Sequence, residues 1–549
     1  MKKMISLILA LMLVVGTLAG CSGDGGESST PQESANGSTA ESAQEASEGE
    51  EQVGPEFSYP MDGTVTLTIN REPYDLNEVP EYARENYFWE RIQEETGIGL
   101  EFIGSAANST SMSEEFLLLL ASGEYPDMFV CDWIVFPGGP SAALADGYIQ
   151  TLDKYIEWMP NLQQYLTEHP DVDRMIRTDS SELYGTPWLR EEGTNIGGGM
   201  SIRKDWLDQV GLEVPTTLEE LHAALTAFKN ELNVEHPMSF EFRWMWEQYM
   251  IGPLSSAFNT CYPYYVIDNE VFFGPLTEGY KDMVYTLAKW YEEGLLDTDI
   301  ATVDKSTVQS KFANGEIGVV IQQFSNTENC IKVLEQTDPS YEVAAVPSLV
   351  QDKNDTATFG QYWLSFEGSF MLSMSTQTEY AEQVCRFMDY NYSPEGIMLC
   401  AYGTEGVSYE ADENGNFKEF TDLVLNNPDG DDPSTARRYF AVVQNWSYPG
   451  LDLNYFVDER TLAIMDIWGN SANMKEHVFP PVTYNEEENK IVSAKFSTME
   501  TYCREQITKF ILGTISLEQW DSFIDELIKL GAEELQNIAQ NAYDRFMAR

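Results

Sequence analysis

The stretch GTVTLTIN, residues 63–70, opens the pattern that decides the fold. Its β-branched residues favour a strand. In NYFWERIQEETGI, residues 86–98, apolar side chains recur at helical spacing before a glycine that can end a helix. Further segments repeat the alternation of strand, helix and strand: GLEFIGSA (99–106), SEEFLLLLASGEY (113–125) and PDMFVCDW (126–133). Strands that alternate with helices predict a parallel, doubly wound α/β sheet.

Local signals of the same kind continue along the chain. Thr217 and Glu220 form a capping-box pattern at the start of a helical sequence. Asn414-Gly415 lies between two extended runs and predicts a hairpin turn. The glycine run at residues 197–199 predicts a hinge where the chain crosses between lobes, and a flexible surface loop or a strand bulge is the alternative.

The first residues are typical of an exported lipoprotein. Lys2 and Lys3 precede an apolar run at residues 4–16, which is shorter than the roughly 20 residues that a membrane-spanning helix needs and predicts a secretory signal. The sequence LAGC ending at Cys21 resembles a bacterial lipobox. Residues 1–20 are therefore expected to be removed, and Cys21 to be lipidated as the first mature residue. Residues 22–57 are rich in Ser, Glu and Gly and predict a disordered tether with a reach of roughly 30–35 Å.

The composition excludes several classes of function. The net charge is −58, from 32 Lys and Arg against 90 Asp and Glu. Such a chain is not expected to neutralise nucleic-acid phosphates or to lie flat on an anionic membrane. The part that follows the tether exceeds the roughly 250–300 residues at which a single core stops growing, so we expect at least two lobes.

Catalytic and metal-binding motifs are not found in the sequence. The histidines are isolated, and there is no HExxH, GxSxG or phosphate-binding glycine motif. The cysteines other than Cys21 show no CxxC spacing and are expected to be buried like small apolar residues. We therefore predict no catalytic residue, no metal and no cofactor. A loosely bound calcium ion at the acidic turn of residues 427–434 stays open as an alternative.

An ordered set of segments carries a resemblance to a known family. The segments are ASGEYPDMFVCDW, LYGTPW, DWLDQVGLEVPTTLEELHAALTAFK, FANGEIGVVI, YGTEGVSYE and FILGTISLEQWDSFIDELIKLGAEELQNIAQNAYDRF. From about residue 64 to residue 546 the chain resembles the extracellular solute-binding proteins of carbohydrate ABC importers, and most of all the large lipoprotein branch of Gram-positive bacteria. The set, rather than any single motif, carries the resemblance.

The resemblance implies a periplasmic-binding-protein-like α/β fold with two lobes, each a doubly wound sheet, and a helical C-terminal region. Lobe one is expected at residues 64–190 and 348–400, and lobe two at residues 196–346 and 401–549. Such proteins close on their ligand by hinge motion. The implied protein is a monomer on the extracellular face, anchored to the membrane through its lipid alone. It would deliver its ligand to ABC permease subunits on separate chains.

A sugar has apolar ring faces and many hydroxyl groups, so its site needs Trp or Tyr platforms with polar side chains at their edges. In the family a ligand-facing loop lies where this chain has Asp132 and Trp133, and a stacking aromatic residue lies in the segment of Trp244 and Trp246. For each tryptophan, a place in the core is the alternative. The candidate ligand-binding residues are Asp132, Trp133, Trp188, Glu191, Arg243, Trp244, Trp246, Gln361, Trp363, Tyr402, Glu405, Asn445 and Trp446.

These patterns, together with the resemblance, predict a tethered receptor that binds a sugar or oligosaccharide for an importer. Two alternatives stay open. The first is a receptor for another solute, such as a peptide or a sugar acid, whose carboxylate Arg203 or Arg243 could pair. The second is a surface glycoside hydrolase, since 90 acidic residues offer many carboxylate pairs and no pattern that identifies one.

Overall fold

The computed structural model describes residues 57–71, 75–103, 114–189, 196–246, 248–335, 340–361, 366–431, 433–441 and 459–549. The predicted lipidation site Cys21 and most of the predicted tether lie outside these ranges. Within them, every helix is too short or too polar to cross a lipid bilayer.

The first sheet has the strand order β2-β1-β3-β11-β4. Strands β1 (Thr66–Ile69), β2 (Gly99–Phe102) and β3 (Met128–Val130) run parallel, as the strand–helix alternation predicts. Strand β11 (Phe366–Met374) is antiparallel to both β3 and β4 (Thr186–Leu189). Strand β4 therefore points the same way as the first three strands.

The second sheet has the order β10-β5-β9-β6 and is mixed. Strand β6 (Met238–Phe240) is parallel to β9 (Val319–Gln323). Strand β5 (Gly198–Arg203) is antiparallel to β9 and to β10 (Val343–Val346). The chain enters this sheet from the first one at the start of β5, so β5 runs away from the crossing while β6, β9 and β10 run back toward it.

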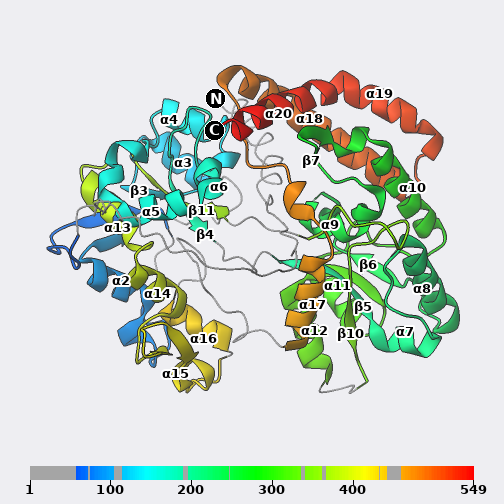
Figure 1. The fold of residues 1–549 in the computed structure, drawn as a ribbon, viewed down its shortest axis with the longest axis horizontal. Coiled ribbons are helices and arrows are strands. Elements are labelled where there is room, and N and C mark those ends of the chain that lie inside the picture. The colour runs from blue at the N-terminus through cyan, green and yellow to red at the C-terminus, as the bar shows by residue number, and fades with distance from the viewer. Residues whose placement is uncertain are drawn as a thin grey trace, which may run out of the picture.

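Figure 1 shows these sheets in two lobes that lie side by side, with β3, β4 and β11 in one and β5, β6 and β10 in the other. The predicted two-lobed α/β fold is confirmed. The helices of the first lobe are α2 (Phe88–Thr96), α3 (Glu114–Ser122), α4 (Gly139–Ala145), α5 (Pro160–Glu168), α6 (Pro170–Met175), α13 (Ala381–Tyr390) and α14 (Pro394–Tyr402). Those of the second are α7 (Lys204–Val210), α8 (Leu218–Glu231), α9 (Gln248–Ser255), α10 (Glu278–Glu292), α11 (Lys305–Ala313), α12 (Phe324–Glu335) and α17 (Glu459–Asn470).

Residues 402–440 pack on the first lobe, whereas the sequence placed them with the second. They form the hairpin of β12 (Tyr409–Ala411) and β13 (Phe417–Phe420), followed by α15 (Asp422–Leu425) and α16 (Pro433–Phe440). Buried side chains of this segment share one hydrophobic cluster with Val79 and Ala83, which precede α2. The hairpin turn predicted at Asn414-Gly415 is confirmed, since the N–H groups of Asn414 and Asn416 donate to Oδ1 of Asp412 at 2.8 and 2.9 Å.

A helical layer ends the chain, as predicted. It consists of α18 (Glu486–Ile511), α19 (Trp520–Leu530) and α20 (Ala532–Met547), with Gly531 in the left-handed conformation at the expected break. Helix α18 packs on α10 of the second lobe. Helix α20 packs on β8 (Glu270–Phe273), which pairs with β7 (Tyr264–Ile267). Figure 1 shows this layer along one side of the molecule, reaching from the second lobe toward the first.

The predicted glycine hinge is a close-packed strand. Gly198 and Gly199 lie inside β5, are buried, and do not adopt positive φ angles. A Cβ atom on Gly199 would lie 2.6 Å from the indole ring of Trp468 in α17. The Trp468 Nε1–H also donates to the carbonyl of Met200 at 2.9 Å. These glycines let α17 approach the sheet, so their small size matters more than their flexibility.

The core is shared between the lobes. One contiguous cluster of buried apolar side chains runs from Leu67 in β1 through Ile202 in β5 to Phe546 in α20. The cysteines of the described residues are all buried and form no disulfide with one another, as expected for small apolar side chains.

Replacing Gly199 with alanine should lower the free energy of unfolding by roughly 1–3 kcal/mol, because the added methyl group overpacks the contact with Trp468. Urea denaturation measures the change. In a Trp468→Leu background the ring is gone, so the same substitution should lower stability by less than about 1 kcal/mol. An equal loss in both backgrounds would contradict this account of the glycine.

Candidate functional site

In each sheet the edge where the chain crosses between lobes holds the carboxyl ends of all strands but one, since β11 in the first sheet and β5 in the second run the other way. Strand β4 ends at Leu189, opposite Phe366 at the start of β11, and both residues border a crossing. In the second sheet, the ends of β6 and β9 lie beside Gly198 at the start of β5. In open α/β sheets ligands bind beyond the carboxyl ends of the strands. These two edges are therefore the candidate site.

Trp246 lies at the second-sheet edge in η4 (Phe242–Trp246), the 3-10 helix that directly follows β6. Phe242 and Tyr262 make edge-on contacts with its ring, at centroid distances of 5.9 and 5.3 Å. The guanidinium carbon of Arg504 in α18 lies 5.5 Å from the centroid of the same ring. The side chain is 9% exposed. These contacts hold the indole in a fixed orientation.

Arg504 is itself held by a buried carboxylate. It pairs with Glu500 one helical turn earlier in α18, and the hydroxyl of Tyr262 donates to Oε1 of Glu500 at 3.3 Å. Burial raises the pKa of Glu500, while the charge of Arg504 opposes that shift. Because both partners support the ring of Trp246 or its neighbour Tyr262, this pair positions the aromatic group rather than facing solvent.

Three polar side chains near the same edge have buried atoms without a hydrogen-bond partner in the described part of the chain. The Oε1 atom of Gln361 accepts the N–H of Gly197 at 2.8 Å, which leaves its buried Nε2 unpartnered. Gln322 donates through Nε2 to Thr327 at 3.0 Å, and its Oε1 is unpartnered. Oε2 of Glu241 is the third such atom. Buried polar atoms are usually satisfied in native structures, so exceptions at a sheet edge point to a ligand.

Arg243 and Trp244 lie beside Glu241. Nε of Arg243 donates to Oε1 of Glu241 at 2.6 Å, and its guanidinium carbon lies 4.0 Å from the centroid of the Trp244 ring. Arg243 is exposed, whereas Trp244 is only 2% exposed. The structure thus brings Arg243, Trp244, Trp246 and Gln361 to the second-sheet edge and buries the ring of Trp244.

At the first-sheet edge, Asp132 follows β3 and caps a 3-10 turn by accepting the N–H of Ile134 at 3.0 Å. Asn70, just after β1, exchanges two hydrogen bonds with the backbone of Val130 and ties the ends of β1 and β3 together. The ring of Trp133 is 0% exposed and contacts Phe116, Phe129 and Phe136 at centroid distances of 5.5–5.8 Å. In this structure Trp133 is a core residue rather than an open platform.

The remaining candidates divide into two groups. Tyr402 stacks on Phe417 at 4.0 Å within the cluster of residues 402–440, and Glu405 is exposed beside it. Tyr402 belongs to that hydrophobic cluster and Glu405 lies on its surface, so neither is at the candidate edge of the two large sheets. The backbone of Trp188 pairs with Glu367 between β4 and β11, and its side chain lies outside the described part. Glu191, Trp363, Asn445 and Trp446 also lie outside the described residues.

Glu241 and Gln322 were not among the sequence candidates. Glu241 directly follows β6, and Gln322 is the last residue but one of β9. A position at the end of a strand was the one sequence feature that pointed to these two residues. The segments GVVIQQF and MSFEF contain no tryptophan, and a nearby tryptophan marks most of the other candidates. Among the described residues, His, Cys, Asp and Glu side chains form no group of three suited to a metal ion.

The chain matches known proteins over most of its length. The family model described as bacterial extracellular solute-binding protein matches residues 77–398. The fructooligosaccharide ABC transporter substrate-binding protein FusA of Streptococcus pneumoniae is 24% identical over 526 residues, which are 89% of this chain and 92% of that protein. The lipoprotein LipO of Bacillus subtilis is 24% identical over 461 residues, covering 79% of this chain and 84% of LipO.

Solved structures share the fold. FusA in complex with kestose superposes with a TM-score of 0.67 and 21% identity, over 88% of this chain and 99% of that structure. An extracellular solute-binding protein from Bifidobacterium longum subsp. infantis gives a TM-score of 0.70 and 18% identity, over 88% of this chain and 98% of that one.

Truncation of two of the sequence candidates should change stability to very different extents. Trp133→Ala should lower the free energy of unfolding by about 3–5 kcal/mol, because it removes a fully buried ring from the core. Glu405→Ala should change it by less than about 0.5 kcal/mol, because this side chain is exposed. Chemical denaturation of both variants measures the difference. A Trp133→Ala protein as stable as the wild type would show that the ring is not a core element.

Proposed function

The chain belongs to the family of bacterial extracellular solute-binding proteins, and from this we propose that it binds a sugar or oligosaccharide between its two lobes and delivers it to an ABC permease. The observation that carries the proposal is the second-sheet edge. There an indole fixed by Arg504 lies in the same region as polar side chains whose buried atoms have no hydrogen-bond partner within the described ranges. An aromatic platform with hydrogen-bonding groups around it suits the apolar face and the hydroxyl groups of a pyranose or furanose ring.

The ligand we propose is neutral. The net charge of −58 disfavours a polyanion at long range. At the candidate site the carboxyl groups of Asp132 and Glu241 lie at the two sheet edges, and Arg243 is paired with Glu241. The similarity to FusA, whose structure contains kestose, supports an oligosaccharide of neutral sugars.

We assign lobe one to residues 64–189 with 366–440, and lobe two to residues 196–346 with 459–549. Each assignment follows a sheet and the hydrophobic clusters packed on it. The lobes close on the ligand by a hinge motion at the segments that connect the two sheets. The candidate ligand contacts are Asp132 on lobe one, and Glu241, Arg243, Trp246, Gln322 and Gln361 at the opposite edge.

We also propose that Cys21 carries the lipid that holds the protein at the outer face of the cell membrane. The signal-like residues 1–20 and the lipobox support this anchor, as does the similarity to LipO, which is named a lipoprotein. One acyl chain binds a membrane only marginally, so stable anchoring needs more than one. A Ser- and Glu-rich tether would then let the two lobes reach a permease nearby.

We further propose that the protein binds its ligand and catalyses no reaction on it. The family consists of solute-binding proteins. The protein acts as a monomeric receptor, while permease and ATPase functions belong to other chains.

Isothermal titration with three kinds of compound tests the ligand class. They are a panel of neutral oligosaccharides that includes kestose, the sugar acid trigalacturonate and the peptide trialanine. We expect binding of at least one neutral oligosaccharide, with the sugar recovered intact by chromatography. Hydrolysis products would indicate a glycosidase. Heat with trigalacturonate alone or trialanine alone would indicate a receptor for sugar acids or for peptides.

Variants of Gln361 test the site in the same titration. Gln361→Glu keeps the oxygen that accepts the N–H of Gly197 and loses the amide donor, whereas Gln361→Met loses both. Both should weaken binding by about tenfold, the equivalent of one hydrogen bond. Gln361→Met should also lower the melting temperature of the ligand-free protein. Unchanged affinity in both variants would remove Gln361 from the site.

Replacing Cys21 with serine tests the anchor. In a Gram-positive host the wild-type protein should fractionate with membranes, and Cys21→Ser should appear in the medium, because a hydroxyl group cannot form the thioether to the lipid. Immunoblots of both fractions measure the distribution. A variant that stays in the membrane fraction would show that another element holds the protein there.

A further inference from the structure

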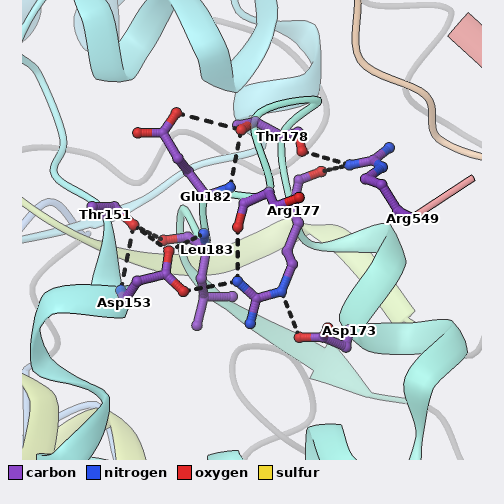
Figure 2. Close-up of polar contacts among 9 residues, drawn as sticks. Thr151, Asp153, Asp173, Arg177, Thr178, Glu182, Leu183 and Arg549 are labelled. Atoms are coloured by element: carbon purple, nitrogen blue, oxygen red, sulfur yellow. Dashed lines mark hydrogen bonds and ion pairs between the residues drawn. The ribbon is translucent and has the colours of Figure 1, made fainter. Parts of the chain in front are cut away.

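The loop that leads into β4, residues 177–183, is fixed to the first lobe by Arg177 (Figure 2). Its Nε donates to Oδ1 of Asp173 at 2.7 Å, and its Nη1 donates to Oδ1 of Asp153 at 2.8 Å. The same Nη1 also donates to the carbonyl of Ser181 at 2.9 Å. Asp153 in turn accepts the N–H of Leu183 at 2.8 Å through Oδ2. All of these partners belong to the first lobe, so the loop moves with it.

Helix α20 is fixed to the second lobe. The N–H groups of Val271 and Phe273 in β8 donate to the side-chain oxygens of Gln540 and Gln536, at 2.7 and 2.8 Å. Arg545, near the end of the helix, forms a bidentate ion pair with Glu488 in α18. Its Nη1 donates to Oε1 at 2.9 Å and its Nη2 to Oε2 at 2.5 Å. Helices α18 and α20 are thereby tied to each other and to β8.

The same arginine reaches the first lobe. Nε of Arg545 donates to Oδ2 of Asp179 at 2.7 Å, and the hydroxyl of Thr483 donates to Oδ1 of Asp179 at 2.9 Å. Arg549 donates through Nη1 to the carbonyls of Arg177 and Thr178, at 2.7 and 2.6 Å, as Figure 2 shows.

We call this group the interlobe clamp, made of Asp179 on the first lobe and Thr483, Glu488, Arg545 and Arg549 on the other side. Its charged side chains are largely shielded from water, with exposed fractions of 13% for Asp179, 12% for Glu488, 35% for Arg545 and 11% for Arg549. Removing one partner of a shielded pair leaves the others uncompensated, and this is more destabilising than the loss of an exposed ion pair. The contacts therefore resist separation of the two lobes.

The clamp lies away from the segments that connect the lobes, so it can oppose rotation about them. The chain leaves the first sheet at Leu189, the carboxyl end of β4, whereas the clamp grips the loop before Thr186 at the other end. Strand β4 has four residues, or about 13 Å at ~3.3 Å per residue. Rotation of the lobes about the crossings must therefore shift the loop against α20, and the clamp opposes that shift.

We propose that the interlobe clamp limits how far the ligand-free lobes separate and so preorganises the site for its ligand. The proposal rests on the proposed function for its effect on affinity, but not for its effect on lobe separation. A protein whose lobes sample fewer open states loses less conformational freedom when a ligand closes them, and binds more tightly without any added ligand contact.

Single-molecule FRET of the ligand-free full chain tests the clamp. Dyes are placed on cysteines introduced at Glu413 and Glu219, which are exposed on the first and second lobe, in a Cys21→Ser background. The other cysteines are buried and stay unlabelled. The test variant is Asp179→Asn, which removes the charge that faces Arg545. The matched control is Asp173→Asn, which weakens an ion pair of Arg177 within the first lobe.

We expect Asp179→Asn to broaden the distribution of interlobe distances toward longer values and to weaken binding of the oligosaccharide found by titration by roughly two- to thirty-fold. Asp173→Asn should leave both measurements as in the wild type. Thr483→Val removes the hydrogen bond that the Thr483 hydroxyl donates to Asp179 and leaves the ion pair with Arg545 in place. It should act in the same direction with a smaller effect, and it replaces Asp179→Asn if that variant does not fold.

A distance distribution that is unchanged in Asp179→Asn and Thr483→Val would overturn the proposal. An equal change in Asp173→Asn would do the same, since it would show a general loosening of the loop. The FRET measurement needs no ligand, so a wild-type protein that binds no sugar would refute the proposed function and leave the clamp to be judged on distances alone.

Discussion

The hydrogen bond from the N–H of Gly197 to Oε1 of Gln361 joins two of the segments that connect the lobes. Gly197 precedes the first strand of the second sheet, and Gln361 lies on the way back to β11 in the first. Both segments must pass the carboxyl edges of the sheets, because β4 ends and β11 begins there. The amide nitrogen of Gln361 is a buried donor with no partner among the described residues. The residue that connects the lobes thus also places a polar group at the candidate site, and a ligand that accepted a hydrogen bond from this amide would be coupled to the geometry of the lobes.

Strand β4 is gripped at both ends. Its carboxyl end continues into a crossing, and the loop before its amino end is held by Arg177 from one side and by Arg545 and Arg549 from the other. A single attachment would leave the lobes free to swing about it. Two attachments separated by a rigid strand restrict that freedom. The continuous apolar core, which extends from β1 to α20, acts in the same direction.

The elements that sequence predicts well are those fixed by neighbouring residues. The capping box of Thr217 and Glu220 forms both of its hydrogen bonds, the parallel strands of the first sheet lie where the alternation places them, and the hairpin turns at Asn414-Gly415. Contacts between distant residues were harder to predict. Trp133 and Trp246 both follow strands, but only the three-dimensional packing shows that phenylalanines enclose one ring and that an arginine more than 250 residues away supports the other. The glycine run has the sequence pattern of a hinge, and only the contact of Gly199 with Trp468 shows that it is a close-packed strand.

The scarcity of cations explains why the arginines matter so much. With 32 Lys and Arg against 90 Asp and Glu, an arginine on the surface would find many carboxylates, and most such exposed pairs contribute little to stability. Arg177, Arg504 and Arg545 are instead placed where neighbouring elements shield them. Arg504 and Arg545 join segments far apart in the sequence, and Arg177 joins α6 to the segment of Asp153. In such sites a guanidinium group makes several directed bonds at once, which a lysine cannot do. Arg504 supports the ring of Trp246 at the second-sheet edge, and Arg545 joins the loop before β4 to α18.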